Sequence, residues 1–232
     1  MNSFRPRLIL FDIDGTLLKG GRRPRRWFGE SLQSVYGQAG DIDNHSFSGK
    51  TDPQIVTELM QGAGVSEERI LSLLPDLKEV YLGRMREQLT ADDMKLLPDV
   101  VAVLTKLEEA SDVTLGLLTG NWEGGARSKL ACFDLNRFFP FGAFGDDRAD
   151  RADLPPVALE RALQDRGRPF DPWETLIVGD SPRDVACARA HGIRAAAVAT
   201  GYTSREHLEA IGADWVLAEL GEAERIHPMF GS

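Results

Sequence analysis

The chain has 232 residues, a formal net charge of −9 and 42% hydrophobic residues. This hydrophobic content predicts a folded core and excludes general disorder. The acidic balance argues against nucleic acid as the main partner, because a phosphate backbone is bound by basic faces. No run approaches the roughly 18 apolar residues of a membrane span, and the two cysteines match no metal-binding spacing. We therefore expect a cytoplasmic protein with no membrane partner, whose oligomeric state the sequence leaves open.

Short apolar runs alternate with helical patterns along most of the chain. Helix starts are indicated by Asp99, Pro155, Ser181 and Ser204. Strands that alternate with helices predict an α/β fold, with a Rossmann-like parallel sheet and helices on both faces. The strand candidates are Leu8–Ile13, Val113–Leu118, the weaker Phe141–Phe144, Leu176–Val178, Ala195–Ala199 and Trp215–Leu217.

Residues 19–94 break this alternation. Helical patterns lie near 24–37, 52–62 and 66–89, and no convincing strand lies between them. We therefore expect an all-helical domain at 19–94, inserted after the first strand of an α/β core. That core would consist of residues 1–18 and 95–232.

The first strand candidate leads into two acidic residues, Asp12 and Asp14, which are followed by Gly15 and Thr16. Open parallel sheets bind ligands at the carboxyl ends of their strands, where both acids are expected. Buried carboxylates are costly unless a cation, a set of donors or a reaction uses them. A plain Asp-Gly turn after a strand is the alternative interpretation.

The strand candidate at 113–118 is followed by Thr119, Gly120 and Asn121. Backbone amides in a turn between a strand and a helix point outward and bind anions, aided by the helix N-terminus. A threonine that only caps a helix is the alternative for this motif.

A third motif places Asp180 at the end of a strand and Asp184 four residues later. Mg²⁺ prefers oxygen ligands, so these acids and the first strand's acid predict a magnesium site. The alternative is that Asp184 binds no metal and only occupies a solvated first helical turn, where the helix dipole favours an acid. A phosphate dianion would need a cation among so many acids. The chemistry that fits is attack of a carboxylate on phosphorus.

The three motifs, in this order from Leu8 to Asp184, resemble those of the haloacid dehalogenase (HAD) superfamily. The helical insert is similar to its C1-type cap, and the chain looks like a phosphoglycolate phosphatase. The resemblance implies that Asp12 is the nucleophile, which becomes an aspartyl-phosphate. It also implies that Asp14 is the general acid and base, and that its backbone carbonyl binds Mg²⁺.

The same resemblance assigns the remaining motif residues. Thr119 and the amides of Gly120 and Asn121 would hold the phosphoryl oxygens. Asp180 would ligate Mg²⁺, and Asp184 would ligate it or order its waters.

A fourth motif of the superfamily, a lysine that neutralises nucleophile and phosphate, is absent from residues 145–154. Arg151 aligns best with it, just ahead of the helix at Pro155, and an arginine binds phosphate bidentately. Some HAD hydrolases that resemble phosphoglycolate phosphatase carry arginine at this position. Arg148 and Lys129 are the alternatives.

Within the insert, Lys50 lies in a segment that looks like the cap's substrate loop, although a surface lysine is the alternative. The resemblance implies a Mg²⁺-dependent phosphatase for a small, phosphoglycolate-like phosphomonoester. A sugar phosphomutase similar to β-phosphoglucomutase and a non-catalytic regulatory or binding protein are the alternatives. Asp14 argues against dehalogenase and phosphonate-hydrolase chemistry, which lack this second acid. A dinucleotide site is disfavoured because the first strand leads into Asp-Gly-Thr instead of a Gly-x-Gly-x-x-Gly turn.

Overall fold

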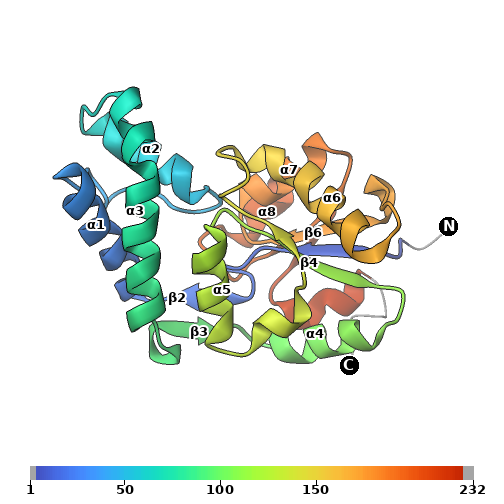
Figure 1. Ribbon diagram of the computed structural model, residues 1–232. Helices are drawn as coiled ribbons and strands as arrows, with labels where there is room; N and C mark the ends of the chain where they lie inside the picture. Colours follow the sequence, from blue (N-terminus) through green and yellow to red (C-terminus); the bar gives the residue numbers. More distant parts are fainter. Residues whose placement is uncertain (1–3, 227–232) are drawn as a thin grey trace.

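Six parallel strands form the central sheet of the computed structural model, which describes residues 4–226 (Figure 1). Every strand candidate is recovered, and the weak one at 141–144 is a strand of two residues. The sheet confirms the predicted Rossmann-like α/β fold. In spatial order the strands are β5 (Gly142–Ala143), β4 (Thr114–Leu118), β1 (Leu8–Phe11), β6 (Thr175–Gly179), β7 (Arg194–Val198) and β8 (Trp215–Leu217).

Helices cover both faces of this sheet because successive strand residues point to opposite sides. Ile9 and Phe11 of β1 belong to one apolar cluster, whereas Leu8 and Leu10 belong to the other. β1 is buried on both faces and paired on both edges, so the residues that follow it begin near the middle of the sheet. The first cluster is covered by α4 (Val100–Glu109) and α5 (Glu123–Ala131), and the second by α6 (Leu154–Arg166), α7 (Pro182–Ala190) and α8 (Arg205–Ala210).

Three helices between β1 and β4 form a separate layer beside the carboxyl ends of the strands (Figure 1). They are α1 (Arg22–Tyr36), α2 (Asp52–Gly62) and α3 (Glu67–Gln88), close to the ranges expected from the sequence. Two of the starts have side-chain caps: the Thr51 hydroxyl accepts from the amide of Gln54 at 3.2 Å, and Ser66 accepts from that of Arg69 at 3.4 Å. We call α1–α3 the helical insert.

The helical insert has its own apolar cluster, which includes one side chain from the sheet domain. Trp122, at the start of α5, stacks on Phe28 with ring centroids 6.1 Å apart and contacts Tyr81. Trp122 is 2% exposed, so its indole packs instead of standing free in the cavity. This packing attaches the insert to the segment that directly follows the Thr119–Asn121 turn.

The expectation of a strand-free insert was wrong at its two ends. β2 (Leu18–Gly20) and β3 (Met94–Leu96) pair antiparallel and form a small second sheet where the chain leaves and re-enters the core. Each strand has three residues, too few to show an alternating pattern. The pairing joins residues 74 to 78 positions apart in the chain, so no local sequence pattern indicates either strand.

Two further features of the described residues concern the cysteines and membrane-spanning segments. Cys132 and Cys187 are both free thiols, the second fully buried. No helix in the 4–226 range is long and apolar enough to cross a membrane.

Candidate active site

The predicted site residues converge at the carboxyl ends of three neighbouring strands. Asp12 follows β1, Thr119 follows β4 and Asp180 follows β6. The amide of Asp12 donates to Val178 at 2.9 Å, which continues the sheet pairing by one residue. A cavity of about 320 Å³ opens there, and residues of the helical insert, among them Lys50, form its opposite wall.

Three buried carboxylates form the floor of the site. Oxygen atoms of Asp12, Asp180 and Asp184 all lie within 4.8 Å of one another, and each residue is at most 4% exposed. Gly15, at φ 92°, faces this cluster, and a Cβ there would lie 2.5 Å from Asp180 Oδ2. A glycine at this position therefore lets the turn after β1 close over the acids.

Burial and mutual repulsion destabilise the negative charges of this cluster. Burial and the charges of Asp12 and Asp184 together raise the pKa of Asp180 to about 8. Burial also raises the pKa of Asp12 to about 6, although the positive charge of Arg151 opposes that shift. Acids this close together need a cation if all of them are to be ionised at neutral pH.

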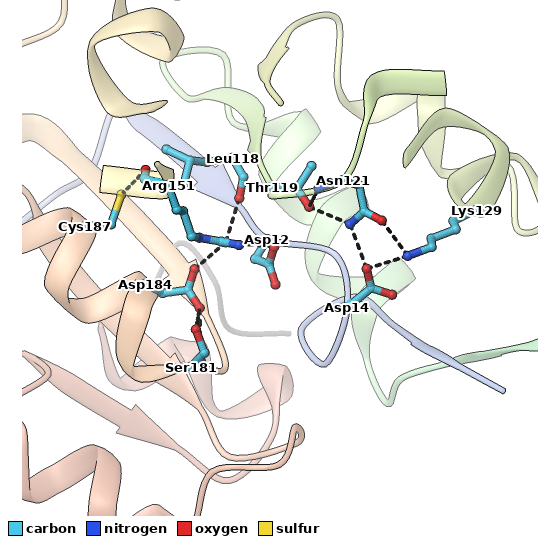
Figure 2. A network of polar contacts seen from close by, with 10 residues as sticks. All are labelled: Asp12, Asp14, Leu118, Thr119, Asn121, Lys129, Arg151, Ser181, Asp184 and Cys187. Carbon is cyan, nitrogen blue, oxygen red and sulfur yellow. Dashed lines mark hydrogen bonds and ion pairs between the residues drawn. The ribbon is translucent and has the colours of Figure 1, made fainter. Parts of the chain in front are cut away.

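Arg151 supplies one positive charge (Figure 2). Its Nη2 donates to Asp12 Oδ1 at 2.9 Å, to Asp184 Oδ1 at 2.5 Å and to the Leu118 carbonyl at 3.1 Å. Burial disfavours its charge, but the two carboxylates outweigh this and hold the pKa of the guanidinium above its ordinary value. Arg148, the alternative from the same segment, is exposed and donates to the neighbouring Asp147 carbonyl.

The remaining charge of the cluster fits a divalent cation. Arg151 pairs with two of the three carboxylates, so two negative charges are left to be compensated when all three are ionised. All three side chains offer carboxylate oxygens, the ligands preferred by hard cations such as Mg²⁺. Asp184 is held in place by the amide of Ser181 at 3.0 Å and its hydroxyl at 2.7 Å, both donating to Oδ2.

The Thr119–Asn121 turn lines the same cavity as Asp12 and Asp180 and follows the strand next to β1. Thr119 is fully buried, and its hydroxyl accepts from the Asn121 side-chain amide at 2.9 Å. The chain of the insert crosses directly over Gly120, where any Cβ would collide with the Lys50 carbonyl. A side chain at this position would therefore separate the insert from the turn.

The second acid of the first motif has a different cationic partner. Lys129 Nζ on α5 lies 2.6 Å from Asp14 Oδ2, and Asn121 Nδ2 donates to the same oxygen at 2.7 Å (Figure 2). The sequence offered Lys129 as an alternative partner for the nucleophile. In the structure Arg151 contacts Asp12, and Lys129 contacts Asp14 instead.

Lys50, in the segment between α1 and α2, lines the cavity from the insert side. Its ammonium donates to the Glu58 carboxylate and lies 3.2 Å from His45 Nε2. Arg25, Phe28 and Tyr81 also line this wall. No sequence motif identifies these three, because they come from α1 and α3 and meet at the cavity only after the helices pack.

Asp52, the first residue of α2, is a cavity residue to which sequence reasoning gave no role in the site. Its amide donates to the Gly120 carbonyl at 2.7 Å, and its Oδ2 accepts from the amide of Trp122 at 2.8 Å. The insert thus binds the turn on both sides of Asn121. Burial raises the pKa of Asp52 to about 7, against an opposing effect of Lys129. In the sequence, Asp52 was marked only by its place at the start of the helical pattern of α2.

The raised pKa of Asp52 predicts a pH-dependent stability difference. Between about pH 4 and pH 7 the Asp52 carboxyl is protonated in the folded protein and ionised in the unfolded chain. The free energy of unfolding therefore falls as the pH rises through this range. Asp52→Asn keeps an acceptor oxygen and removes that loss. Since the cavity leaves some water near the group, we expect a gain of about 1 kcal/mol at pH 8, or about 2–4 °C in melting temperature, and none at pH 4.

Thermal unfolding in EDTA at both pH values measures the difference. Asp52→Ala, which also removes the acceptor for Trp122, is the matched control and is expected to be less stable than Asp52→Asn. An Asn variant that is equally destabilised at both pH values would contradict the assignment.

The structure is an α/β fold with buried acids at the carboxyl ends of neighbouring parallel strands. A family model described as haloacid dehalogenase-like hydrolase matches residues 9–198, and the chain belongs to this family. Its relatives include phosphoglycolate phosphatase 1 of Pseudomonas aeruginosa, 29% identical over 203 residues, which cover 85% of this chain and 71% of that protein. The phosphoglycolate phosphatase of Synechococcus elongatus is 28% identical over 213 residues, 90% of this chain and 91% of that protein.

Solved structures have the same fold. A protein described as a predicted phosphatase, from Clostridium acetobutylicum, superimposes with a TM-score of 0.72 at 19% identity, covering 95% of this chain and 97% of that one. CbbY from Rhodobacter sphaeroides in complex with phosphate gives a TM-score of 0.71 at 21% identity, covering 94% and 96%. The family and the curated relatives together identify the chain as a hydrolase of the phosphatase type.

Proposed function

We propose that the protein is a Mg²⁺-dependent phosphatase, which hydrolyses a small phosphomonoester through an aspartyl-phosphate on Asp12. The observation that carries the proposal is the cluster of Asp12, Asp180 and Asp184 within 4.8 Å, of which Asp12 and Asp180 line one cavity together with the Thr119–Asn121 turn. A phosphoryl group in this cavity would meet the Asp12 nucleophile and the Thr119–Asn121 turn, and backbone amides at a turn between a strand and a helix bind anions.

The proposed roles follow from the contacts of each residue. The Asp12 carboxylate attacks phosphorus, and Asp14 gives a proton to the departing oxygen. Asp14 then takes a proton from the water that hydrolyses the acyl-phosphate. Asp180 and Asp184, together with Asp12 and the Asp14 carbonyl, would hold the cation, which neutralises charge on the phosphoryl oxygens when bound.

The helical insert is proposed to be a cap domain spanning residues 19–94, which encloses the substrate. Lys50 would contact the organic end of the substrate from the insert, opposite the acids. We propose a phosphoglycolate-like substrate, because both reported curated relatives are named phosphoglycolate phosphatases and Lys50 offers a cation to a second anionic group.

Phosphate release from 2-phosphoglycolate and from a panel of other phosphomonoesters tests this function. We expect free inorganic phosphate as product with Mg²⁺ present, at least a hundred-fold less after EDTA treatment, and recovery when Mg²⁺ is restored. Turnover that EDTA leaves unchanged would remove Asp180 from its proposed role. An isomerised sugar phosphate, formed only with a bisphosphate activator, would instead identify a phosphomutase.

A further inference from the structure

Lys129 is a nearly buried lysine in the last turn of α5, 7% exposed. A buried ammonium is costly unless it is paired. Its nitrogen donates to Asp14 Oδ2 and to Asn121 Oδ1, both at 2.6 Å. The second cation of the site is therefore directed at the second acid, on the other side of the nucleophile from Arg151 (Figure 2).

These contacts form a closed ring of three side chains. Asn121 Nδ2 donates to Asp14 Oδ2 at 2.7 Å, while Asn121 Oδ1 accepts from Lys129. The lysine thus fixes the orientation of the Asn121 amide as well as that of the carboxylate. Within residues 4–226, all recorded side-chain bonds to Asp14 reach Oδ2, which leaves Oδ1 for a reacting group.

The Asp14 side chain is held by residues from outside the turn after β1, namely Asn121 and Lys129. The Asp14 side chain is 40% exposed, whereas the Asp12 side chain is 6% exposed and accepts a hydrogen bond from Arg151. A general acid or base acts only when it is held within hydrogen-bond reach of the proton it transfers. A solvated carboxylate with free rotamers would spend much of its time elsewhere.

We propose that Lys129 is a positioning residue for the reaction: with Asn121 it holds Asp14 by Oδ2, so that Oδ1 faces the oxygen atoms that exchange protons with it. The inference rests on the proposed phosphatase function. In the first step the Asp12–phosphorus bond forms, the ester P–O bond breaks and the Asp14 proton goes to the leaving oxygen. In the second step a water oxygen attacks phosphorus, its proton goes to Asp14 and Asp12 leaves as a carboxylate.

Formation and hydrolysis of the aspartyl-phosphate differ in whether they need a proton transfer, and this difference distinguishes a positioning role for Lys129 from simple phosphate binding. p-Nitrophenolate is a stable anion and leaves without a proton, whereas hydrolysis of the acyl-phosphate requires the base. For Lys129→Met with p-nitrophenyl phosphate we expect a burst of about one p-nitrophenolate per active site, then a steady-state rate roughly 10²-fold lower. The inorganic phosphate inhibition constant is expected to change less than about two-fold. Equal slowing of both steps, or much weaker phosphate inhibition, would overturn the proposal.

A double-mutant cycle tests whether Lys129 acts through Asp14. In an Asp14→Asn background, Lys129→Met is expected to cost less than about two-fold further. Independent, multiplicative losses would mean that the lysine acts elsewhere. Lys95→Met, the same change at an exposed position on β3, is expected to leave wild-type kinetics. If Lys129→Met does not fold, Asn121→Ala removes the other arm of the ring, and it should show the same burst.

A crystal structure of Lys129→Met gives a readout that does not depend on turnover. We expect the Asp14 carboxylate to leave its present position, while Asp12 and Arg151 keep theirs. An unmoved carboxylate would overturn the inference even in an active enzyme. A displaced carboxylate in a protein whose wild type releases no phosphate would instead reject the phosphatase function and leave the positioning intact.

Discussion

Asp12→Asn is expected to abolish phosphate release, by at least roughly 10⁴-fold, while the protein stays folded. The amide nitrogen and carbonyl of asparagine cannot act as the attacking carboxylate, and removal of a covalent nucleophile is among the largest single losses in an enzyme. Inorganic phosphate release from p-nitrophenyl phosphate, with CD as the check of folding, measures the effect. Retained activity would refute the nucleophile assignment.

The same substitution is expected to stabilise the metal-free protein. The pKa of Asp12 is raised to about 6, chiefly by burial, so its charge destabilises the folded state increasingly as the pH rises from about 4 to about 6. At pH 8 in EDTA the melting temperature of Asp12→Asn should therefore exceed that of the wild type. Asp134→Asn, at a side chain 88% exposed, is the control and should change neither activity nor stability.

Arg151→Ala is expected to reduce turnover by roughly 10²–10³-fold. Its guanidinium is the cation that contacts the nucleophile and Asp184 together, and loss of such charge stabilisation in a buried site has effects of this size. Two buried carboxylates would also lose their partner, which costs about 3–5 kcal/mol of stability when a buried pair is broken. Saturating Mg²⁺ should restore part of that stability and little of the rate.

Arg148→Ala is the matched control, three residues away and exposed. We expect it to change turnover less than about two-fold, because its side chain contacts only a neighbouring carbonyl within the described part of the chain. Similar, mild effects of the two alanine variants would show that Arg151 is not the cation that neutralises the Asp12 nucleophile. Arg151→Lys should recover part of the rate, since it restores the charge without the planar fork.

Local patterns identified most elements because their signals lie within a few residues. The helical patterns at 52–62 and 66–89 predicted α2 and α3 to within one residue, and the Thr51 and Ser66 side chains cap the starts of these helices. β1 ended two residues earlier than expected, at Phe11, because the chain turns at Asp12–Gly15 to close over the site. The β2–β3 pairing could not be anticipated, since its partners are brought together by the insert between them.

The sequence by itself determined the family resemblance, the sheet and the set of acids. Asp12, Asp14, Asp180 and Asp184 are adjacent to strand ends, and strand ends meet at one edge of a parallel sheet. Only the tertiary structure decided how the cations are distributed. From the sequence, Arg151 and Lys129 were alternatives for the cation that neutralises the nucleophile. In the structure the turn before α6 places Arg151 against Asp12, and α5 places Lys129 against Asp14. Such pairing depends on distances between side chains from separate elements, which no local pattern encodes.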